Sequence, residues 1–88
     1  MFIYSIFDKK ANVHRVQMVL RDNAEAVRSV ARTANNGNSD LFMFSNDFAL
    51  YNLGELNTDT GRITPIVPIE FVCEVSSLIK LDKGSESN

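Results

Sequence analysis

The sequence has few of the residues that carry catalytic or metal-binding chemistry. It contains one cysteine (Cys73), one histidine (His14) and no tryptophan. A single cysteine cannot form an internal disulfide or a CxxC motif, and a zinc site generally needs three or four cysteine or histidine ligands. A nucleophile needs a positioned base, and pairing His14 with Cys73 or with any one serine would be arbitrary. We therefore expect no enzymatic activity, no metal and no cofactor.

Glycine and long apolar runs are also scarce. Gly37, Gly54 and Gly61 are isolated, so no glycine-rich phosphate-binding loop joins a strand to a helix. No apolar run approaches the ~18 residues of a membrane span, and no signal peptide precedes the first predicted strand. With its single cysteine, the chain fits a reducing cytoplasm better than a membrane or an oxidising compartment.

The composition is that of one small globular domain. Hydrophobic residues make up 44% and charged residues 23% of the 88 positions, which is ordinary for a folded protein. We assign residues 1–81 to a single domain and residues 82–88 to a flexible polar C-terminal tail. A domain this short has a free energy of unfolding of roughly 4–13 kcal/mol. Dimerisation would be a natural supplement, and we expect a homo-oligomer.

The net charge of −2 argues against tight, nonspecific binding to nucleic acid, which depends on lysine and arginine. The charge is uneven, however, since residues 1–35 carry +3 and residues 36–88 carry −5. The asymmetry is compatible with a basic face, although a mixed solvated surface explains it as well. The basic side chains of the first part are Lys9, Lys10, Arg15, Arg21, Arg28 and Arg32.

The first part of the chain predicts a β-hairpin and a helix. Residues 2–7 are almost entirely apolar, and residues 13–20 alternate between apolar and polar side chains, so the two segments should pair as strands. Asp22 and Glu25 form a capping box at a helix start. An apolar face follows, and Gly37 should end the helix as a left-handed cap. Arg28 and Arg32 lie on the opposite face, as ion-paired surface residues or as phosphate contacts.

Residues 41–44, Leu-Phe-Met-Phe, form an apolar segment between this helix and the next predicted strand. The segment is compatible with a strand, a core plug or an exposed patch. We favour burial in the core or in a subunit contact, because aromatic clusters are usually buried. The alternative is a base-stacking platform, since single-strand binders combine aromatic rings with cations.

Residues 48–66 predict a second β-hairpin. Two strand-like runs flank a polar loop, in which Asn57 and Asp59 can accept backbone hydrogen bonds and Gly61 can take a positive φ. Gly54 within the first run indicates a bulge or a close backbone approach.

Residues 69–79 fit two patterns. Phe71, Val72, Val75, Leu78 and Ile79 have helical spacing, whereas Ile69, Phe71, Cys73 and Val75 alternate as in a strand. We favour the helix because the spacing persists for three turns. The predicted fold is α+β, an antiparallel sheet of two β-hairpins with two helices on one face, in the order β-β-α-β-β-α.

Several short motifs carry a resemblance to a known family. Asn46-Asp47-Phe48, Leu50-Tyr51, Leu53-Gly54 and the turn from Asp59 to Gly61, with the opening residues 4–11, resemble a small nonstructural protein of gokushoviruses. These are single-stranded DNA phages of the microvirus group. The resemblance spans most of residues 2–80, and the family also looks helical over residues 69–79. It implies a nonstructural protein that binds DNA or controls its synthesis.

The resulting hypothesis is a phage nonstructural protein in the cytoplasm of the bacterial host, which binds single-stranded DNA or assists its synthesis or packaging. The charge map, and not the family, supplies the candidate residues. Phosphate contacts are expected from Lys9, Lys10, Arg15, Arg21, Arg28 and Arg32, and base stacking from Phe42 or Phe44. The alternative is a homodimer or adaptor that contacts a phage replication or host protein and never binds DNA. One contiguous positive face would favour the first, and scattered ion pairs would favour the second.

Overall fold

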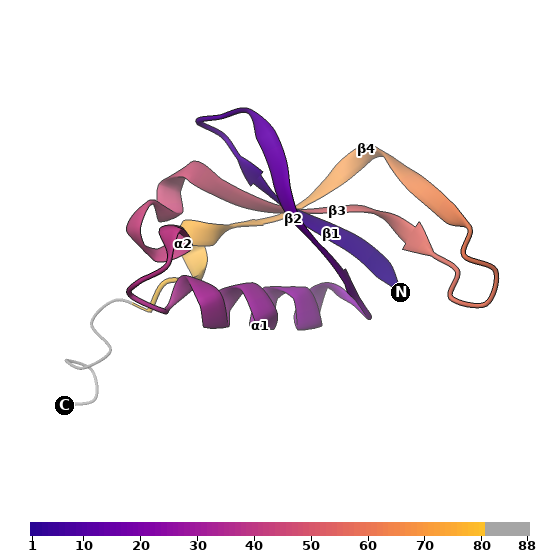
Figure 1. Ribbon diagram of the computed structural model, residues 1–88, viewed down its shortest axis with the longest axis horizontal. Coiled ribbons are helices and arrows are strands. Elements are labelled where there is room, and N and C mark those ends of the chain that lie inside the picture. The colour runs from indigo at the N-terminus through magenta and orange to yellow at the C-terminus, as the bar shows by residue number, and fades with distance from the viewer. Residues whose placement is uncertain (81–88) are drawn as a thin grey trace.

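The computed structural model describes residues 1–80, so the predicted tail over residues 82–88 lies outside the described residues. Four antiparallel strands form one sheet, β1 (Phe2–Asp8), β2 (Val13–Leu20), β3 (Phe48–Leu56) and β4 (Ile63–Glu74). Their order across the sheet is β2-β1-β3-β4, so two hairpins meet where β1 pairs with β3 (Figure 1). The α+β prediction with a sheet of two hairpins is confirmed.

The capping box forms at the start of helix α1 (Asn23–Ala34). The Glu25 backbone N–H donates to Asp22 Oδ1 at 2.9 Å, and the Glu25 carboxylate accepts from the Arg21 N–H at 2.9 Å. The predicted left-handed cap at Gly37 is wrong, since Gly37 does not have a positive φ. Asn35 caps the helix instead, because its side-chain amide donates to the carbonyls of Ala31 and Leu78 at 2.7 and 2.9 Å.

The apolar segment 41–44 belongs to a short helix, α2 (Asp40–Met43), followed by the 3₁₀ turn η1 (Ser45–Asp47). Leu41 packs against the core, but Phe42, Met43 and Phe44 are exposed. Burial of the whole segment in the core is therefore wrong, whereas its burial in a subunit contact stays a prediction. A four-residue helix has one inward side, which leaves no room for four large side chains in the core.

The predicted helix over residues 69–79 is also wrong, because β4 continues to Glu74 and only the 3₁₀ turn η2 (Val75–Leu78) follows. β4 pairs with β3 from Ile63 to Glu74 with two register shifts. One shift leaves the four residues 66–69 of β4 opposite the single residue Leu53 of β3, and Figure 1 shows β4 bent there, away from α1.

No helix within residues 1–80 is long and apolar enough to cross a membrane.

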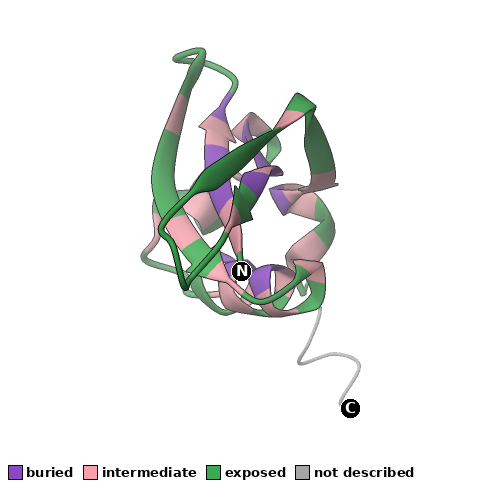
Figure 2. Cartoon of the chain, turned by 90° about the vertical axis from the view of Figure 1, so that its right-hand side faces the viewer, coloured by how far each residue is buried: buried purple, intermediate pink, exposed green. Residues whose placement is uncertain are grey.

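The core lies between α1 and one face of the sheet. Alternate residues of β1 and β3 point toward the helix, and the buried residues gather in this layer (Figure 2). The core residues are Tyr4, Ile6, Ala26, Val30, Ala34, Phe48, Leu50 and Val75. Both α-helices lie on this side of the sheet, with α2 against α1 (Figure 1). Among residues 1–80, no helix covers the other face of the sheet.

The second hairpin has the turn chemistry predicted for Asn57 and Gly61, while no hydrogen bond to the Asp59 carboxylate forms among the residues described. Asn57 Oδ1 accepts from the N–H groups of Asp59 and Thr60 at 2.9 and 3.2 Å, and Gly61 has φ 80°. Gly54 lies at a register shift, where a Cβ atom would approach the Thr64 carbonyl oxygen to 2.6 Å. The close approach predicted from Gly54 is therefore confirmed.

Candidate nucleic-acid interface

Four aromatic side chains form a continuous row across the uncovered face of the sheet. His14 (β2), Phe7 (β1), Tyr51 (β3) and Phe71 (β4) follow one another in the order of the strands. The ring centroids are 4.7 Å apart for Phe7 and His14, 6.1 Å for Phe7 and Tyr51, and 5.7 Å for Tyr51 and Phe71. We call these four residues the aromatic row.

Strand alternation and register place the aromatic row. Phe7 follows Ile6, and Tyr51 follows Leu50, and both of these neighbours are in the core. Successive side chains of a strand point to opposite faces, so Phe7 and Tyr51 point away from α1. The register then pairs Phe7 with His14 and Tyr51 with Phe71. Neighbouring rings meet at tilted or edge-on angles, an arrangement worth about 0.5–1.5 kcal/mol per pair beyond the burial of area.

His14 is held in the row by a buried hydroxyl. The Ser5 Oγ lies 2.6 Å from His14 Nδ1, and Ser5 is fully buried. This contact fixes the orientation of the imidazole ring next to Phe7. The Ser5 hydroxyl resembles an activated nucleophile only in its distance from the imidazole, because burial keeps it from any substrate.

Three of the predicted phosphate-binding residues are in ion pairs. Lys9 Nζ lies 2.7 Å from Glu74 Oε1, Arg15 Nε lies 3.7 Å from Asp8 Oδ2, and Arg21 Nε lies 3.8 Å from Glu25 Oε1. The three pairs join different parts of the chain, and each places a carboxylate beside one of the six predicted cations. Among the residues described, Lys10, Arg28 and Arg32 form no such pair.

Arg28 and Arg32 lie together on the outer side of α1. They line a shallow hollow with Asn35 and Lys80. The Asn35 side chain fixes the backbone there, because its Oδ1 accepts from the Lys80 N–H at 2.7 Å. Sequence reasoning did not include Lys80, whose distance from α1 along the chain hides the contact. This group is separated from the aromatic row by the thickness of the sheet and the helix.

Phe42 and Phe44 do not belong to the aromatic row. Both are exposed at α2, on the helix side of the sheet, and neither is in a ring pair among the residues described. Sequence reasoning missed all four members of the row. The signal was present in Phe7 and Tyr51, each next to a buried strand residue, but it needed the strand register to become a site.

The cysteine and the histidine of the chain lie on opposite sides of the sheet. Cys73 packs against the core on the helix side, while His14 is on the other face. Burial, and to a lesser extent the charge of Glu74, raises the pKa of the Cys73 thiol, although a hydrogen bond with Ser77 acts in the opposite direction. Within residues 1–80, no three histidine, cysteine or carboxylate side chains gather in a way that would hold a metal ion.

The fold and this surface define a small α+β domain whose antiparallel sheet is covered by helices on one face and open on the other. The sequence model of the phage ORF5 protein family matches residues 1–78. The chain belongs to this phage ORF5 family, which confirms the expectation of a phage protein and supports a nonstructural one. Comparison with the curated proteins gives no match, and comparison with the solved structures gives none either.

Proposed function

We propose that this phage nonstructural protein binds single-stranded DNA through the aromatic row, in the cytoplasm of the infected bacterium. The observation that supports the proposal is the row itself, four adjacent rings on the open face of a sheet. Unpaired bases stack on aromatic side chains, and proteins that bind single strands without sequence preference use such platforms. A role in DNA synthesis or packaging agrees with the resemblance to gokushovirus proteins.

Phosphate contacts in this proposal come from Lys9 and Lys10. Lys9 follows Phe7 by two residues, and its ammonium group contacts Glu74 at the end of β4, three residues after Phe71. Lys10 is exposed in the adjoining turn. A DNA strand on the open face leaves Arg28 and Arg32 on the far side of the sheet. The proposal therefore narrows the predicted phosphate contacts to the two lysines of the turn after β1, of which Lys10 also lines a hollow with Phe44.

The experiment is fluorescence anisotropy of a labelled single-stranded oligonucleotide, titrated at low and at physiological salt. Two phosphate contacts predict that log K falls with log salt with a slope of about −1.4, because each contact contributes about −0.7 on a single strand. Lys10→Gln should reduce the slope by about 0.7, whereas Arg28→Gln should leave it unchanged. If Lys10→Gln leaves the salt slope unchanged and Arg28→Gln reduces it, the DNA-binding surface is on α1 and not on the open face of the sheet.

Phe71→Ala tests the base-stacking role of the aromatic row. The Phe71 side chain is 51% exposed, so its removal should leave the fold intact. The loss of one stacking contact should weaken binding of the oligonucleotide by about 1–3 kcal/mol. Phe44→Ala is the matched control, since Phe44 is 53% exposed but lies on the other side of the sheet. Equal affinities for the two variants would contradict stacking on the row.

A second function, a protein-interaction module that does not bind DNA, is favoured by the ion pairs of Lys9, Arg15 and Arg21. Paired cations attract phosphates less than free ones, and the net charge is −2. In this reading the protein is a homodimer or an adaptor to a phage replication or host protein. No binding of the oligonucleotide even at low salt would select this function over the first.

A further inference from the structure

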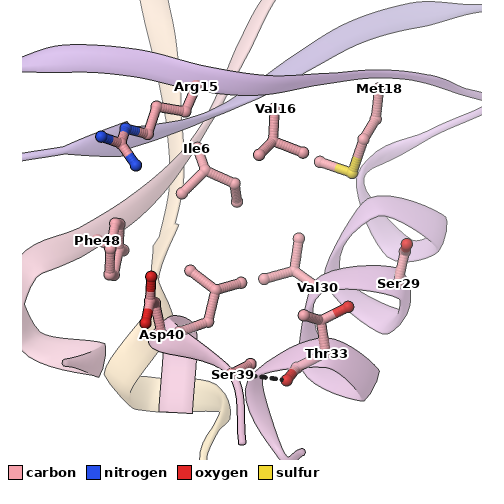
Figure 3. Close-up of a pocket in the computed structure, with 11 residues that line it drawn as sticks. Ile6, Arg15, Val16, Met18, Ser29, Val30, Thr33, Ser39, Asp40 and Phe48 are labelled. Carbon is pink, nitrogen blue, oxygen red and sulfur yellow. Dashed lines mark hydrogen bonds between the residues drawn. The ribbon is translucent and has the colours of Figure 1, made fainter. Parts of the chain in front are cut away.

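An apolar pocket of about 250 Å³ opens between the sheet and the helices (Figure 3). It lies on the helix side, away from the aromatic row, and β1, β2, α1 and α2 all contribute to it. Its apolar lining comes from Ile6, Val16, Met18, Val30, Leu41 and Phe48. A cavity of about 150 Å³ in a protein interior accommodates a benzene ring. The pocket is therefore large enough for one aromatic or methionine side chain.

Directly beside this pocket, the chain exposes three apolar side chains in succession. Phe42, Met43 and Phe44 are 40%, 59% and 53% exposed, and they follow Leu41, which lines the pocket. We call residues 42–44 the α2 knob. Its position is fixed because Ser39 Oγ accepts from the Phe42 N–H at 3.2 Å and donates to the Thr33 carbonyl at 2.9 Å. The knob is thus attached to the end of α1 and does not fold back into its own pocket.

Opposite charges accompany the pocket. Arg15 and Asp40 lie at the same end of it, on β2 and α2 (Figure 3). Arg15 has an ion pair with Asp8 at 3.7 Å, whereas Asp40 has no ion pair among the residues described. The same two residues also border a second hollow that includes Phe44. One continuous surface therefore carries an apolar knob, an apolar pocket, a cation and an anion.

We infer that this surface binds a second copy of the chain, with the α2 knob of each copy seated in the pocket of the other. A two-fold interface brings one patch against itself, so that residue i meets residue j and residue j meets residue i. Across such a two-fold axis, Arg15 of each copy faces Asp40 of the other copy, which gives two contacts between opposite charges in each dimer. A second copy supplies both the apolar group that the pocket accepts and the charge that its rim requires.

The inference is distinct from DNA binding, because the pocket and the α2 knob are on the helix side of the sheet and leave the aromatic row open, although Lys10 lines the second hollow beside Phe44. The test is sedimentation velocity of the full chain across micromolar concentrations. The wild type should show a concentration-dependent dimer. The double variant Phe42→Ser and Phe44→Ser should raise the dimer dissociation constant about tenfold or more, since anchors of this type dominate interface energies. Phe71→Ala, an equally exposed phenylalanine on the open face, is the control and should leave the dimer unchanged.

A charge exchange makes the test specific for this geometry. Asp40→Arg and Arg15→Asp should each weaken the dimer, because each places like charges across the axis. A mixture of the two variants should restore association by forming a heterodimer with opposite charges. Circular dichroism of every variant confirms that it is folded. A wild type that stays monomeric, or a dimer lost in Phe71→Ala but retained in the knob variant, would overturn the inference.

Discussion

Val16 has a backbone conformation that β-branched residues rarely adopt. Its φ is 51°, in the left-handed region, at a bulge where β2 loses register with β1. The sequence pattern placed Val16 on the same apolar face as Met18 and Leu20, but the bulge leaves its side chain 63% exposed. Strain of this kind persists where the surrounding structure requires it, and Val16 borders the pocket proposed as a dimer contact.

Val16→Gly should stabilise the isolated domain. Relief of the left-handed strain of about 1–2 kcal/mol exceeds the entropic cost of glycine, which is about 0.5–1 kcal/mol. The expected increase in the free energy of unfolding is about 0.5–1 kcal/mol, measured by urea denaturation. Asn12→Gly is the control, because Asn12 has a similar φ of 61° and asparagine tolerates the left-handed region. Its substitution should therefore change the free energy of unfolding by roughly a few tenths of a kcal/mol. A lower free energy of unfolding for Val16→Gly would show that the backbone of Val16 is not strained.

Gly54→Ala should destabilise the second hairpin. The new Cβ atom would meet backbone atoms of Thr64 and Pro65 at 2.6 and 3.1 Å, and a backbone neighbour cannot move aside without shifting β4. We expect a loss of about 1–3 kcal/mol in the free energy of unfolding. Gly37→Ala is the matched control, since a Cβ atom there meets nothing within 4 Å. Equal melting temperatures for the two variants would show that β4 can shift to accommodate the Cβ atom without a loss of stability.

At the scale of the elements, a polar chain connects β1, α1 and β4. The Tyr4 hydroxyl donates to Asn23 Oδ1 at 2.7 Å, and Asn23 Nδ2 donates to Glu70 Oε2 at 3.3 Å. Tyr4 is fully buried. Burial, and then the charges of Asp22, Glu70 and Glu25, raises the pKa of the Tyr4 phenol above its ordinary value of 10.0.

This raised pKa predicts a loss of stability in alkali. The unfolded chain releases the Tyr4 proton at a lower pH than the folded chain does, so the folded state binds more protons above pH 10. The stabilisation is fully present below the ordinary pKa and is lost as the pH rises through the raised one. Tyr4→Phe should reduce this decline while it costs about 1 kcal/mol at neutral pH for the lost hydrogen bond. Urea unfolding over a series of alkaline pH values measures both effects, and an unchanged decline in Tyr4→Phe would exclude Tyr4 as its source.

The elements that could be predicted from the sequence were those whose residues fit a single secondary-structure pattern. Residues 2–8, 13–20 and 48–56 alternate or are continuously apolar, and the N-terminal capping box of α1 is a local signal. Residues 69–79 satisfied two patterns, and pairing of β4 with β3 decided between them, which no local signal contains. The bulge at residues 66–69 belongs to the same pairing. Short helix α2 gave no pattern, because four residues are too few to show a helical period.

At the scale of the whole molecule, the sheet separates two surfaces. The helix side holds the pocket, the α2 knob and the hollow lined by Arg28 and Arg32, while the open side holds the aromatic row. Sequence reasoning combined cations and phenylalanines from both sides into one DNA site, because linear order does not show on which face of a sheet a side chain lies. The row joins residues from four strands and was beyond prediction until their order and register were known.

The central claim is that single-stranded DNA stacks on the open face of the sheet. The most direct measurement is an NMR titration of the ¹⁵N-labelled protein with a single-stranded oligonucleotide, which maps the contact residue by residue. Our account predicts amide shifts concentrated at Phe7, His14, Tyr51 and Phe71, with α1 unperturbed. Shifts confined to the outer side of α1 around Arg28 and Arg32, or no shifts at saturating oligonucleotide, would contradict it.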